Sequence, residues 1–455
     1  EPYPYQKQGI AYAINKKRAL IGDKPGLGKT LQAIGAVSYL NAFPCLVICP
    51  ASLKLNWEKE WEKFSYHKAE VLNDSLKNTW PYINQAGLVD IFIVNYESLG
   101  KYFLLRTDNF GGKAKLSDMV FNPNIKLFKS IIIDESHRTK DPSTQQSKLV
   151  KALSVGKPVV YLLSGTPVVN DPQDLIPQLS ILNMLGSFGG AKIFKDRYCT
   201  ANYFRELHSK LRLNCFFSRE KEEVLKDLPP KVRQIVPVEI TTQEEYDLAV
   251  ADLKTYLISY KNATAQQVKR ALRAQILVSF GVLKEISARG KMEFATEYTK
   301  EIINSKEKIV IFCHLKLVAE ELSKTFPNAV TILGKDNYIK RDYAVTEFQN
   351  NPSVTEIICS IKAAGVGLTL TASSIVLFME LPWTDADLTQ CEDRCHRIGQ
   401  KDSVQSIIPL GKGTIDEWIY YEVICGKRKM TQAITGAEYE ITEEHIDSFF
   451  NFLKL

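Results

Sequence analysis

Short apolar runs that lead into polar residues constrain the fold of this chain more than any other feature. Four such runs occur in its first part, at residues 45–49, 90–94, 131–133 and 159–163. Continuous apolar runs of this length are typical of strands buried on both faces of a parallel sheet. Ligands of open α/β sheets bind at the carboxyl ends of the strands. We therefore expect an α/β fold in which the segments after these strands converge on one crevice.

A glycine-rich loop at residues 22–30, GDKPGLGKT, precedes the first of these runs. Its pattern is typical of a loop that binds the phosphates of a nucleotide. Gly26 and Gly28 allow backbone N–H groups to turn toward phosphate oxygens. Lys29 supplies a positive charge for the β- and γ-phosphates, and Thr30 offers a hydroxyl to Mg²⁺. The loop therefore predicts ATP and Mg²⁺ as ligands.

The residues around the loop leave two alternatives open. The common pattern has a glycine where Asp23 stands, so the loop alone also fits an ordinary helix-entry turn. The helical composition of residues 31–40 would place the loop at a helix N-terminus, whose dipole favours phosphate. Upstream, Gln6 has an amide that could pair with the edge of adenine. A solvated helix N-terminus is the other interpretation of Gln6.

Two adjacent acids, Asp134 and Glu135, follow the isoleucine run at residues 131–133. Phosphoryl transfer to water needs a carboxylate that holds hydrated Mg²⁺ and a group that orients the attacking water. Two acids at the end of one strand supply both. A surface turn after a strand is the alternative, and the loop upstream disfavours it.

The alternation of strand and helix stops after Pro167 and returns near Lys308, so we expect a helical insertion between these residues. Two pairs of residues there have the spacing of a capping box, Thr242 with Glu245 and Thr264 with Gln267. Basic residues outnumber acids between residues 251 and 291: Lys254, Lys261, Lys269, Arg270, Arg273, Lys284, Arg289 and Lys291 against Asp252 and Glu285. This bias suits a phosphate backbone, and a merely solvated helix face explains it equally well.

A second α/β unit is predicted from Lys308 onward. Strands are expected at residues 309–312, 329–333, 357–359 and 375–379, with a helix at 317–325. A turn of small residues at 362–369 would allow a ligand to approach the backbone closely.

Two arginines follow in this second unit. If residues 387–397 form a helix, Gln390, Arg394 and Arg397 lie on one face of it. Two arginines on one face suit the γ-phosphate in its transition state, because guanidinium spreads charge and donates two bonds. Plain surface charge is the alternative for these residues in isolation.

Composition sets broad limits. A chain of 455 residues is expected to hold two or three domains, and contents of 45% apolar and 24% charged residues are those of an ordinary globular protein. No apolar run approaches the length of about 18 residues that a membrane span needs, and no signal pattern appears at the start. A formal net charge of +6 permits a polyanionic partner.

The nine cysteines contain no C-x-x-C pair, which predicts reduced thiols and an intracellular location. Cys391, Cys395 and His396 lack an evident fourth ligand, so we do not predict zinc. At the end of the chain, residues 436–455 have the pattern of an acidic amphipathic helix. Docking on its own protein is the simpler interpretation of that helix; autoinhibition and partner binding stay open.

Taken in order, these segments resemble the Swi/Snf family of superfamily-two DNA translocases over nearly the entire chain. The carrying segments are Tyr5-Gln6 with Gly9, the loop 22–30, LVICPASLKLNW (46–57), DESH (134–137), SGTP (164–167), LKDLPPK (225–231), residues 360–370 and DRCHRIGQ (393–400). DESH and the short insertions look more like the annealing-helicase, fork-remodelling branch than the large chromatin remodellers.

The resemblance implies two RecA-like lobes, each a mostly parallel sheet with helices on both faces, that clamp ATP and move on duplex DNA without separating its strands. It implies that Gln6 contacts adenine, that Asp134 holds the metal and Glu135 the water, and that Arg394 and Arg397 act as arginine fingers. Further residues carried over are Gly367 and Gln390 for the nucleotide, Ser164 and Thr166 for coupling to DNA, and Ser52, Lys54, Asn95, Lys362 and Thr369 for backbone phosphates. Two departures are Lys24-Pro25 for the usual Glu-Met and Thr384-Asp385 for the usual Asn-Pro.

We therefore predict lobe 1 at residues 1–172, helical protrusions at 173–300, lobe 2 at 301–425 and an acidic extension at 426–455. The predicted function is a monomeric, DNA-dependent ATPase motor on double-stranded or branched DNA, with no membrane partner. Protein partners through segments before residue 1 or through the C-terminal segment stay open. A strand-separating helicase and an ATP-gated DNA clamp are the alternatives. A nuclease is not predicted, and the biological task is open.

Overall fold

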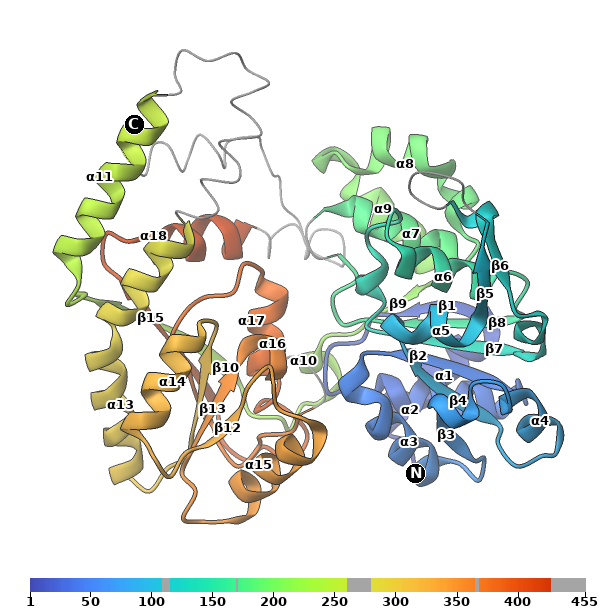
Figure 1. Cartoon of the computed structure of the whole chain (residues 1–455), viewed down its shortest axis with the longest axis horizontal. Coiled ribbons are helices and arrows are strands. Elements are labelled where there is room, and N and C mark those ends of the chain that lie inside the picture. Colours follow the sequence, from blue (N-terminus) through green and yellow to red (C-terminus); the bar gives the residue numbers. More distant parts are fainter. Residues whose placement is uncertain (109–114, 169–170, 260–279, 365–367, 427–455) are drawn as a thin grey trace. The chain divides into compact units, whose positions relative to one another are not determined.

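The structure is a computed structural model that describes residues 1–108, 115–168, 171–259, 280–364 and 368–426. The chain divides into two compact units (Figure 1). We call them lobe 1, Glu1–Lys226, and lobe 2, which begins at Asp227. Each lobe is built around one parallel sheet, as the sequence predicts.

Lobe 1 contains a seven-stranded sheet with the order β3-β4-β2-β7-β8-β1-β9. All of its strand pairs are parallel. The strands are β1 (Arg18–Ile21), β2 (Cys45–Cys49), β3 (Ala69–Val71), β4 (Ile91–Asn95), β7 (Ser130–Asp134), β8 (Val159–Leu163) and β9 (Phe216–Phe217). Because β7, β8 and β1 are neighbours, the segments that follow them meet at one edge of the sheet.

Helices pack around this sheet (Figure 1). They are α1 (Pro4–Lys16), α2 (Lys29–Tyr39), α3 (Lys54–Phe64), α4 (Trp80–Gln85), α5 (Leu99–Phe103), α6 (Gln145–Ser154), α7 (Leu175–Ile181), α8 (Gly190–Tyr198), α9 (Phe204–Asn214) and α10 (Lys221–Val224). The polar stretch at 106–129 contributes to a small antiparallel pair, β5 (Leu104–Thr107) with β6 (Met119–Phe121).

Lobe 2 contains a six-stranded parallel sheet with the order β10-β15-β14-β11-β13-β12. Its strands are β10 (Lys231–Val238), β11 (Ile309–Cys313), β12 (Val330–Ile332), β13 (Glu356–Ser360), β14 (Ile375–Phe378) and β15 (Val404–Gly411). Its helices are α11 (Gln243–Ser259), α13 (Met292–Asn304), α14 (Lys316–Thr325), α15 (Tyr338–Asn350), α16 (Ile361–Ala364), α17 (Asp385–Glu392) and α18 (Ile415–Trp418), with a further helix at 280–290 and a π-helix at Ile419–Ile424.

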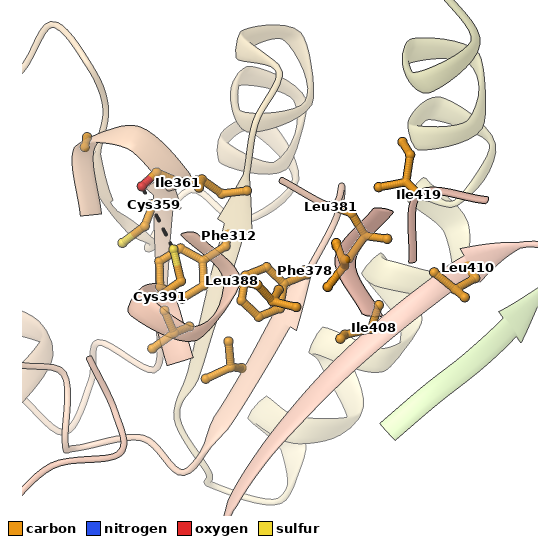
Figure 2. Close-up of a cluster of buried hydrophobic side chains, with 14 of the residues drawn as sticks. Phe312, Cys359, Ile361, Phe378, Leu381, Leu388, Cys391, Ile408, Leu410 and Ile419 are labelled. Atoms are coloured by element: carbon orange, nitrogen blue, oxygen red, sulfur yellow. Dashed lines mark hydrogen bonds between the residues drawn. The ribbon is translucent and has the colours of Figure 1, made fainter. Parts of the chain in front are cut away.

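The core of lobe 2 fixes the position of helix α17. Leu388 and Cys391 of this helix are fully buried and belong to the same cluster as Phe312 and Phe378 of the sheet (Figure 2). The Cys391 thiol also lies 3.9 Å from the backbone oxygen of Ile361. Burial of this apolar face holds α17, and hence the segment after it, against the sheet.

All eight strands predicted from apolar runs are present, but the range 173–300 differs from the prediction of helices alone. It contains β9, which pairs with β1 in lobe 1, and β10, which pairs with β15 in lobe 2. Thr242 and Glu245 do not use their side chains as a capping box: the Thr242 hydroxyl donates to Ile286 O at 2.8 Å, and Glu245 pairs with Arg289.

Several predictions lie outside the described residues. These are the second capping pair, Thr264 with Gln267, the nucleotide contact at Gly367 and the acidic helix at 436–455. The four domain ranges stay predictions. Within the described ranges, none of the helices combines the length and the apolar character that crossing a membrane requires.

Candidate functional site

The loop after β1 has the geometry of a phosphate cradle. Gly26 and Gly28 have φ angles of +90° and +78°, a region that side chains rarely adopt. Lys29 is the first residue of α2, so the loop lies at the N-terminus of a helix of 11 residues. The Lys29 ammonium donates to Asp23 O at 2.7 Å, and Thr30 follows within the first turn of the same helix. The loop backbone and two side chains are therefore arranged around one helix end.

Asp23, which replaces the usual glycine, anchors the loop. Its carboxylate is fully buried, pairs with Arg219 at 2.5 Å and accepts from Gln32 Nε2 at 2.9 Å. Arg219 comes just after β9 and also donates to Tyr5 O. Asp23 is thus a buried counter-ion that fastens the loop to α1, α2 and the end of lobe 1.

Gln6 is buried in α1 and bonded to the loop. Its Nε2 donates to Leu27 O at 3.3 Å, and its Oε1 accepts from Tyr3 N at 2.9 Å. A Cβ on Gly28 would lie 2.4 Å from Gln6 Nε2, so glycine is required for this approach. The structure thus excludes the solvated helix N-terminus as the environment of Gln6.

Asp134 ends β7 and has neutral hydrogen-bond donors. Trp57 Nε1 donates to its Oδ2 at 2.8 Å, and the Glu135 N–H donates to its Oδ1 at 2.9 Å. Burial and the neighbouring charge of Glu135 raise the pKa of Asp134 to about 6, even though Trp57 and Lys29 act in the opposite direction. Since hydrogen bonds and one cation only partly compensate this carboxylate, it is suited to a positively charged ligand.

The side chain of Glu135 links the acid pair at the end of β7 to the turn after β8. Its backbone has φ +51°, a left-handed conformation that is costly for a non-glycine residue and is often found at functional sites. Its Oε2 lies 3.3 Å from His137 Nδ1, which in turn lies 3.0 Å from Ser164 Oγ. Ser164 Oγ also accepts from Thr166 N at 3.2 Å.

The turn after β8 also approaches the phosphate loop. A Cβ at Gly165 would lie 2.8 Å from Pro25 and 3.5 Å from the Lys29 ammonium. On its other side, Gln178 of α7 accepts from the Ser136 hydroxyl at 2.9 Å and donates to Pro167 O at 2.7 Å. Lobe 1 therefore brings the loop, the two acids and the SGTP turn together at one edge of its sheet.

The predicted helix over 387–397 is wrong at its end. Helix α17 stops at Glu392, and Arg394 and Arg397 lie in the turns that follow. We call residues 393–397 the arginine turn. Arg394 is buried, and its backbone oxygen accepts from Leu370 N at 2.8 Å. Arg397 donates to Asp393 O at 2.9 Å and to Thr369 Oγ1 at 3.2 Å. The two arginines are therefore close in the chain, but they do not share a helix face with Gln390.

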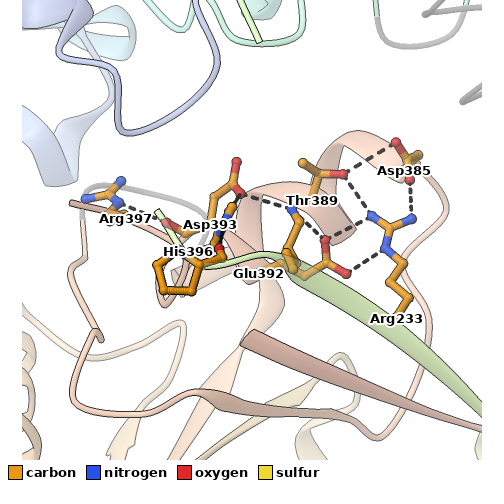
Figure 3. A network of polar contacts seen from close by, with 9 residues as sticks. Arg233, Asp385, Thr389, Glu392, Asp393, His396 and Arg397 are labelled. Carbon is orange, nitrogen blue, oxygen red and sulfur yellow. Dashed lines mark hydrogen bonds and ion pairs between the residues drawn. The ribbon is translucent and has the colours of Figure 1, made fainter. Parts of the chain in front are cut away.

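Buried carboxylates hold the end of α17 to β10 and explain why the helix stops (Figure 3). Glu392 Oε1 accepts from Arg233 Nε at 2.6 Å, and Asp393 Oδ1 lies 3.1 Å from the Lys231 ammonium. In addition, His396 Nε2 lies 2.8 Å from Pro229 O. These contacts draw consecutive residues toward one strand, a direction that a continuing helix could not maintain.

The residues that are predicted to contact DNA are divided between the two lobes, and most of them lie at or just after the end of a strand or at the start of a helix. In lobe 1, Ser52 lies in a 3₁₀ turn after β2, Lys54 begins α3, and Asn95 ends β4 and donates to Glu97 at 2.8 Å. In lobe 2, Lys362 is exposed in α16 and Thr369 contacts Arg397. A DNA-binding role for these residues stays a prediction.

The cysteines of the arginine segment are structural in character. Cys391 and Cys395 are fully buried, and burial raises the pKa of the Cys395 thiol to about 12. In the part of the chain that the structure describes, no group of three or more histidine, cysteine or acidic side chains is arranged to hold a metal ion.

Known proteins share this chain's organisation. The SNF2-related domain family matches residues 5–291, and the helicase conserved C-terminal domain matches residues 291–399. The "SWI/SNF-related matrix-associated actin-dependent regulator of chromatin subfamily A-like protein 1 homolog" of Caenorhabditis elegans is 30% identical over 91% of this chain and 59% of its own length. The "DNA annealing helicase and endonuclease ZRANB3" of Bos taurus is 31% identical over 91% of this chain and 38% of its own length.

A solved structure, "Sulfolobus solfataricus SWI2/SNF2 ATPase core in complex with dsDNA", is 25% identical, covers 96% of this chain and 95% of that chain, and has a TM-score of 0.43. The chain spans less than two thirds of the length of the two relatives named above. The SNF2-related domain alone matches more than half of the chain. The two parallel sheets are RecA-like lobes, and the chain belongs to the SNF2-related ATPase family, with a helicase C-terminal domain after the SNF2-related domain.

Proposed function

We propose that this chain is a DNA-dependent ATPase motor that moves on double-stranded DNA and remodels DNA structures or protein–DNA complexes without processive strand separation. The observation that carries the proposal is the meeting of the phosphate loop, Asp134-Glu135 and the SGTP turn at one edge of the lobe 1 sheet. Two similar proteins are named as DNA annealing helicases or chromatin regulators, which favours DNA as the substrate.

The side chains in lobe 1 fit a magnesium nucleotide. Asp134 is a carboxylate with a raised pKa, and Thr30 offers a hydroxyl at the helix end; both are hard oxygen ligands of the kind Mg²⁺ prefers. When bound, Mg²⁺ neutralises charge on the phosphates. Lys29 would bind the phosphates and Glu135 would orient the attacking water, while Gln6, Gly26, Gly28, Gln390 and Gly367 would contact the nucleotide.

Lobe 2 would supply the remaining charge. In this proposal Arg394 and Arg397 of the arginine turn stabilise the transferring phosphoryl group, so hydrolysis requires the two lobes to close on one nucleotide. Ser164 and Thr166 would report the nucleotide state to bound DNA. Ser164 contacts His137 and, through it, Glu135, while Thr166 N donates to Ser164 Oγ; these contacts support this role.

Steady-state hydrolysis with and without duplex DNA tests the proposal. Lys29→Ala, Glu135→Gln and Arg397→Ala should each lower kcat by at least about a hundredfold. Arg197→Met is the matched control, since Arg197 forms an exposed pair with Glu206 away from these segments. Normal DNA-stimulated hydrolysis in Glu135→Gln would refute the assignment of Glu135.

Two assays separate the motor from its alternatives. A duplex translocase should displace a distant third strand from a triplex and fail to unwind a plain fork processively. Fork unwinding would favour a strand-separating helicase, and hydrolysis without triplex displacement would favour an ATP-gated clamp. Rates on forked, duplex and single-stranded DNA would then narrow the task among fork regression, annealing and protein displacement.

A further inference from the structure

Strand β10 is the first element of lobe 2 and carries two cations on one face. Lys231 and Arg233 are two residues apart, so their side chains leave the same side of the strand. Both reach the end of α17, and Figure 3 shows the contacts of Arg233. Arg233 donates to Glu392 through Nε at 2.6 Å and through Nη2 at 3.0 Å, and the Lys231 ammonium lies 3.0 Å from the same carboxylate. We call these contacts the β10 clamp.

The clamp extends beyond one ion pair. The Arg233 guanidinium also donates to Asp385 at 2.8 Å and to Thr389 Oγ1 at 2.9 Å, so it bonds three side chains of α17 at once. A planar guanidinium fixes direction as well as distance, which an ammonium does not. One arginine therefore sets both the tilt and the rotation of this short helix on the sheet.

Stability alone does not explain so many buried charges. Glu392 is fully buried and Asp393 is 2% exposed. Moving such groups out of water is costly, and well-packed apolar residues often stabilise a site as well as an ion pair does. Directional bonds to a buried carboxylate do provide a fixed geometry.

The residues positioned are the two arginines. Glu392 and Asp393 directly precede Arg394, and the Asp393 backbone oxygen accepts from Arg397 Nε at 2.9 Å. The backbone from which both guanidiniums project is thus attached to the clamp on one side. Asp385, which stands where the family pattern has proline, adds a clamp partner that proline could not supply.

We propose that Arg233, assisted by Lys231, is a positioning residue for ATP hydrolysis that places Arg394 and Arg397 for the transferring phosphoryl group. This inference rests on the proposed function. Arg233 contacts neither the nucleotide-binding loop nor the acids of lobe 1 in any hydrogen bond of the described residues. Its loss should therefore change the rate of the chemical step and leave nucleotide binding by lobe 1 intact.

The test compares Arg233→Lys and Arg233→Met with Lys412→Met in the full chain. Lys412 pairs with Glu239 just after β10 at 2.6 Å, but both side chains are exposed, so it is a matched cation outside the clamp. DNA-stimulated hydrolysis is measured over a range of ATP concentrations, and thermal unfolding is followed for each variant. We expect Arg233→Met to lower kcat by about ten- to a hundredfold with KM for ATP within about twofold.

Arg233→Lys keeps the positive charge, so it tests the positioning role even if Arg233→Met fails to fold. A lysine ammonium has one nitrogen and lacks the planar fork with which Arg233 reaches Glu392, Asp385 and Thr389 from separate nitrogens, so kcat should fall by about fivefold or more while the melting temperature stays near that of the wild type. Lys412→Met should match the wild type in all three quantities. Full kcat in folded Arg233→Lys would overturn the inference, as would a parallel loss of kcat, ATP affinity and melting temperature.

The proposed function is tested separately in the same experiment. A wild-type chain whose hydrolysis is DNA-stimulated and abolished by Lys29→Ala supports that function whatever Arg233 does. A wild-type chain without such hydrolysis overturns the proposed function and this inference together.

Discussion

Asp134 ends a strand of the lobe 1 sheet and Glu392 ends helix α17 beside the lobe 2 sheet, and the surroundings of these two acids shift their pKa values in opposite directions. Burial and Glu135 raise the pKa of Asp134 to about 6. Burial would also raise the pKa of Glu392, but Lys231 and Arg233 outweigh it and hold that pKa below its ordinary value. The first carboxylate is held mainly by an indole and a backbone N–H, the second by two cations.

This difference distinguishes a carboxylate that is suited to a cationic ligand from one that has a structural role. Glu392 has its counter-charges within the protein, so its free energy is already low in the folded chain. Asp134 carries a charge that the fold compensates only in part, which costs stability and favours a cationic ligand. Substitutions at the two positions should therefore affect stability with opposite signs.

The largest stability effect is expected from Glu392→Gln. This change removes the carboxylate that both Lys231 and Arg233 contact, while Asp393 and Asp385 remain as their second partners. A buried charge left without any partner costs about 3 to 5 kcal/mol, so with these partners in place we expect a cost of about 3 kcal/mol. The free energy of unfolding is measured with urea, and Glu239→Gln, which alters an exposed pair, should change it by no more than about 0.5 kcal/mol.

The pH dependence of that effect has a defined sign. A carboxylate with a depressed pKa stabilises the fold above its unfolded pKa, 4.5 for Glu392, and loses this contribution as pH falls through the folded value. The difference in the free energy of unfolding between wild type and Glu392→Gln should therefore be largest near neutral pH and decrease below pH 4.5. A difference that grows on acidification would contradict the clamp.

Asp134→Asn should have the opposite effect on stability. The raised pKa means that the folded state holds the proton more firmly than the unfolded state, in which Asp134 ionises near 3.8. Wild-type stability therefore decreases between pH 3.8 and about 6, and the cost is complete above that range. The amide removes this cost, so Asp134→Asn should be more stable by roughly 1 to 2 kcal/mol near pH 7.5.

ATP hydrolysis should also be lost in Asp134→Asn. Hydrolysis by Asp134→Asn should fall at least about a hundredfold if this carboxylate holds the metal. Urea unfolding at pH 7.5 and near pH 4, without nucleotide or Mg²⁺, measures the stability difference, which should vanish at the lower pH. If Asp134→Asn were less stable than the wild type at pH 7.5, the two acids would not affect stability with opposite signs.

Most strands could be predicted from the sequence because their cores are uninterrupted apolar runs. The missed strands lack that signal. Strand β10, KVRQIVPV, alternates charged and apolar residues at a sheet edge, and β15 contains Pro409. Strand β9 has two residues, and β1 follows a run of basic residues. Short and edge strands owe their structure to the neighbouring strand, which a local pattern does not reveal.

The loop and the acid pair could be predicted because each is a contiguous motif with a known chemistry. The contacts that hold the site residues in place could not be predicted, since the partners are far apart in sequence. Asp23 and Arg219 are 196 residues apart, and Arg233 and Glu392 are 159 apart. The helix over 387–397 was wrong for the same reason: helical spacing is local, whereas the clamp that ends α17 is not.

The pair of Asp23 and Arg219, which anchors the phosphate loop, should affect the affinity for nucleotide. Arg219→Met leaves the buried Asp23 carboxylate without its guanidinium partner beside the loop proposed to bind phosphate. Affinity for a fluorescent ADP should fall by about tenfold, or about 1.4 kcal/mol, because the loop loses its anchor and an uncompensated anion repels the ligand. The same substitution at Arg197 should leave affinity unchanged. Unaltered binding by Arg219→Met would show that the loop needs no anchor.

This substitution and Arg233→Met should be separable. The first weakens nucleotide binding in lobe 1, and the second lowers kcat with KM nearly constant. If both changed the same parameter, the two arginines would not serve different halves of the site.

The smallest effect is expected at Thr384, where the chain departs from the usual Asn-Pro. Thr384 caps α17: its hydroxyl oxygen accepts from Asp387 N at 3.1 Å, and its hydroxyl donates to Asp387 Oδ2 at 2.7 Å. Thr384→Ala should lower the free energy of unfolding by about 1 kcal/mol, and Thr384→Ser, which retains the hydroxyl, should be nearly neutral. The clamp at the other end of α17 is intact in both variants, so kcat should change by less than in Arg233→Lys. A larger loss of kcat in Thr384→Ala than in Arg233→Lys would mean that the start of the helix, and not the β10 clamp at its end, places the arginine turn.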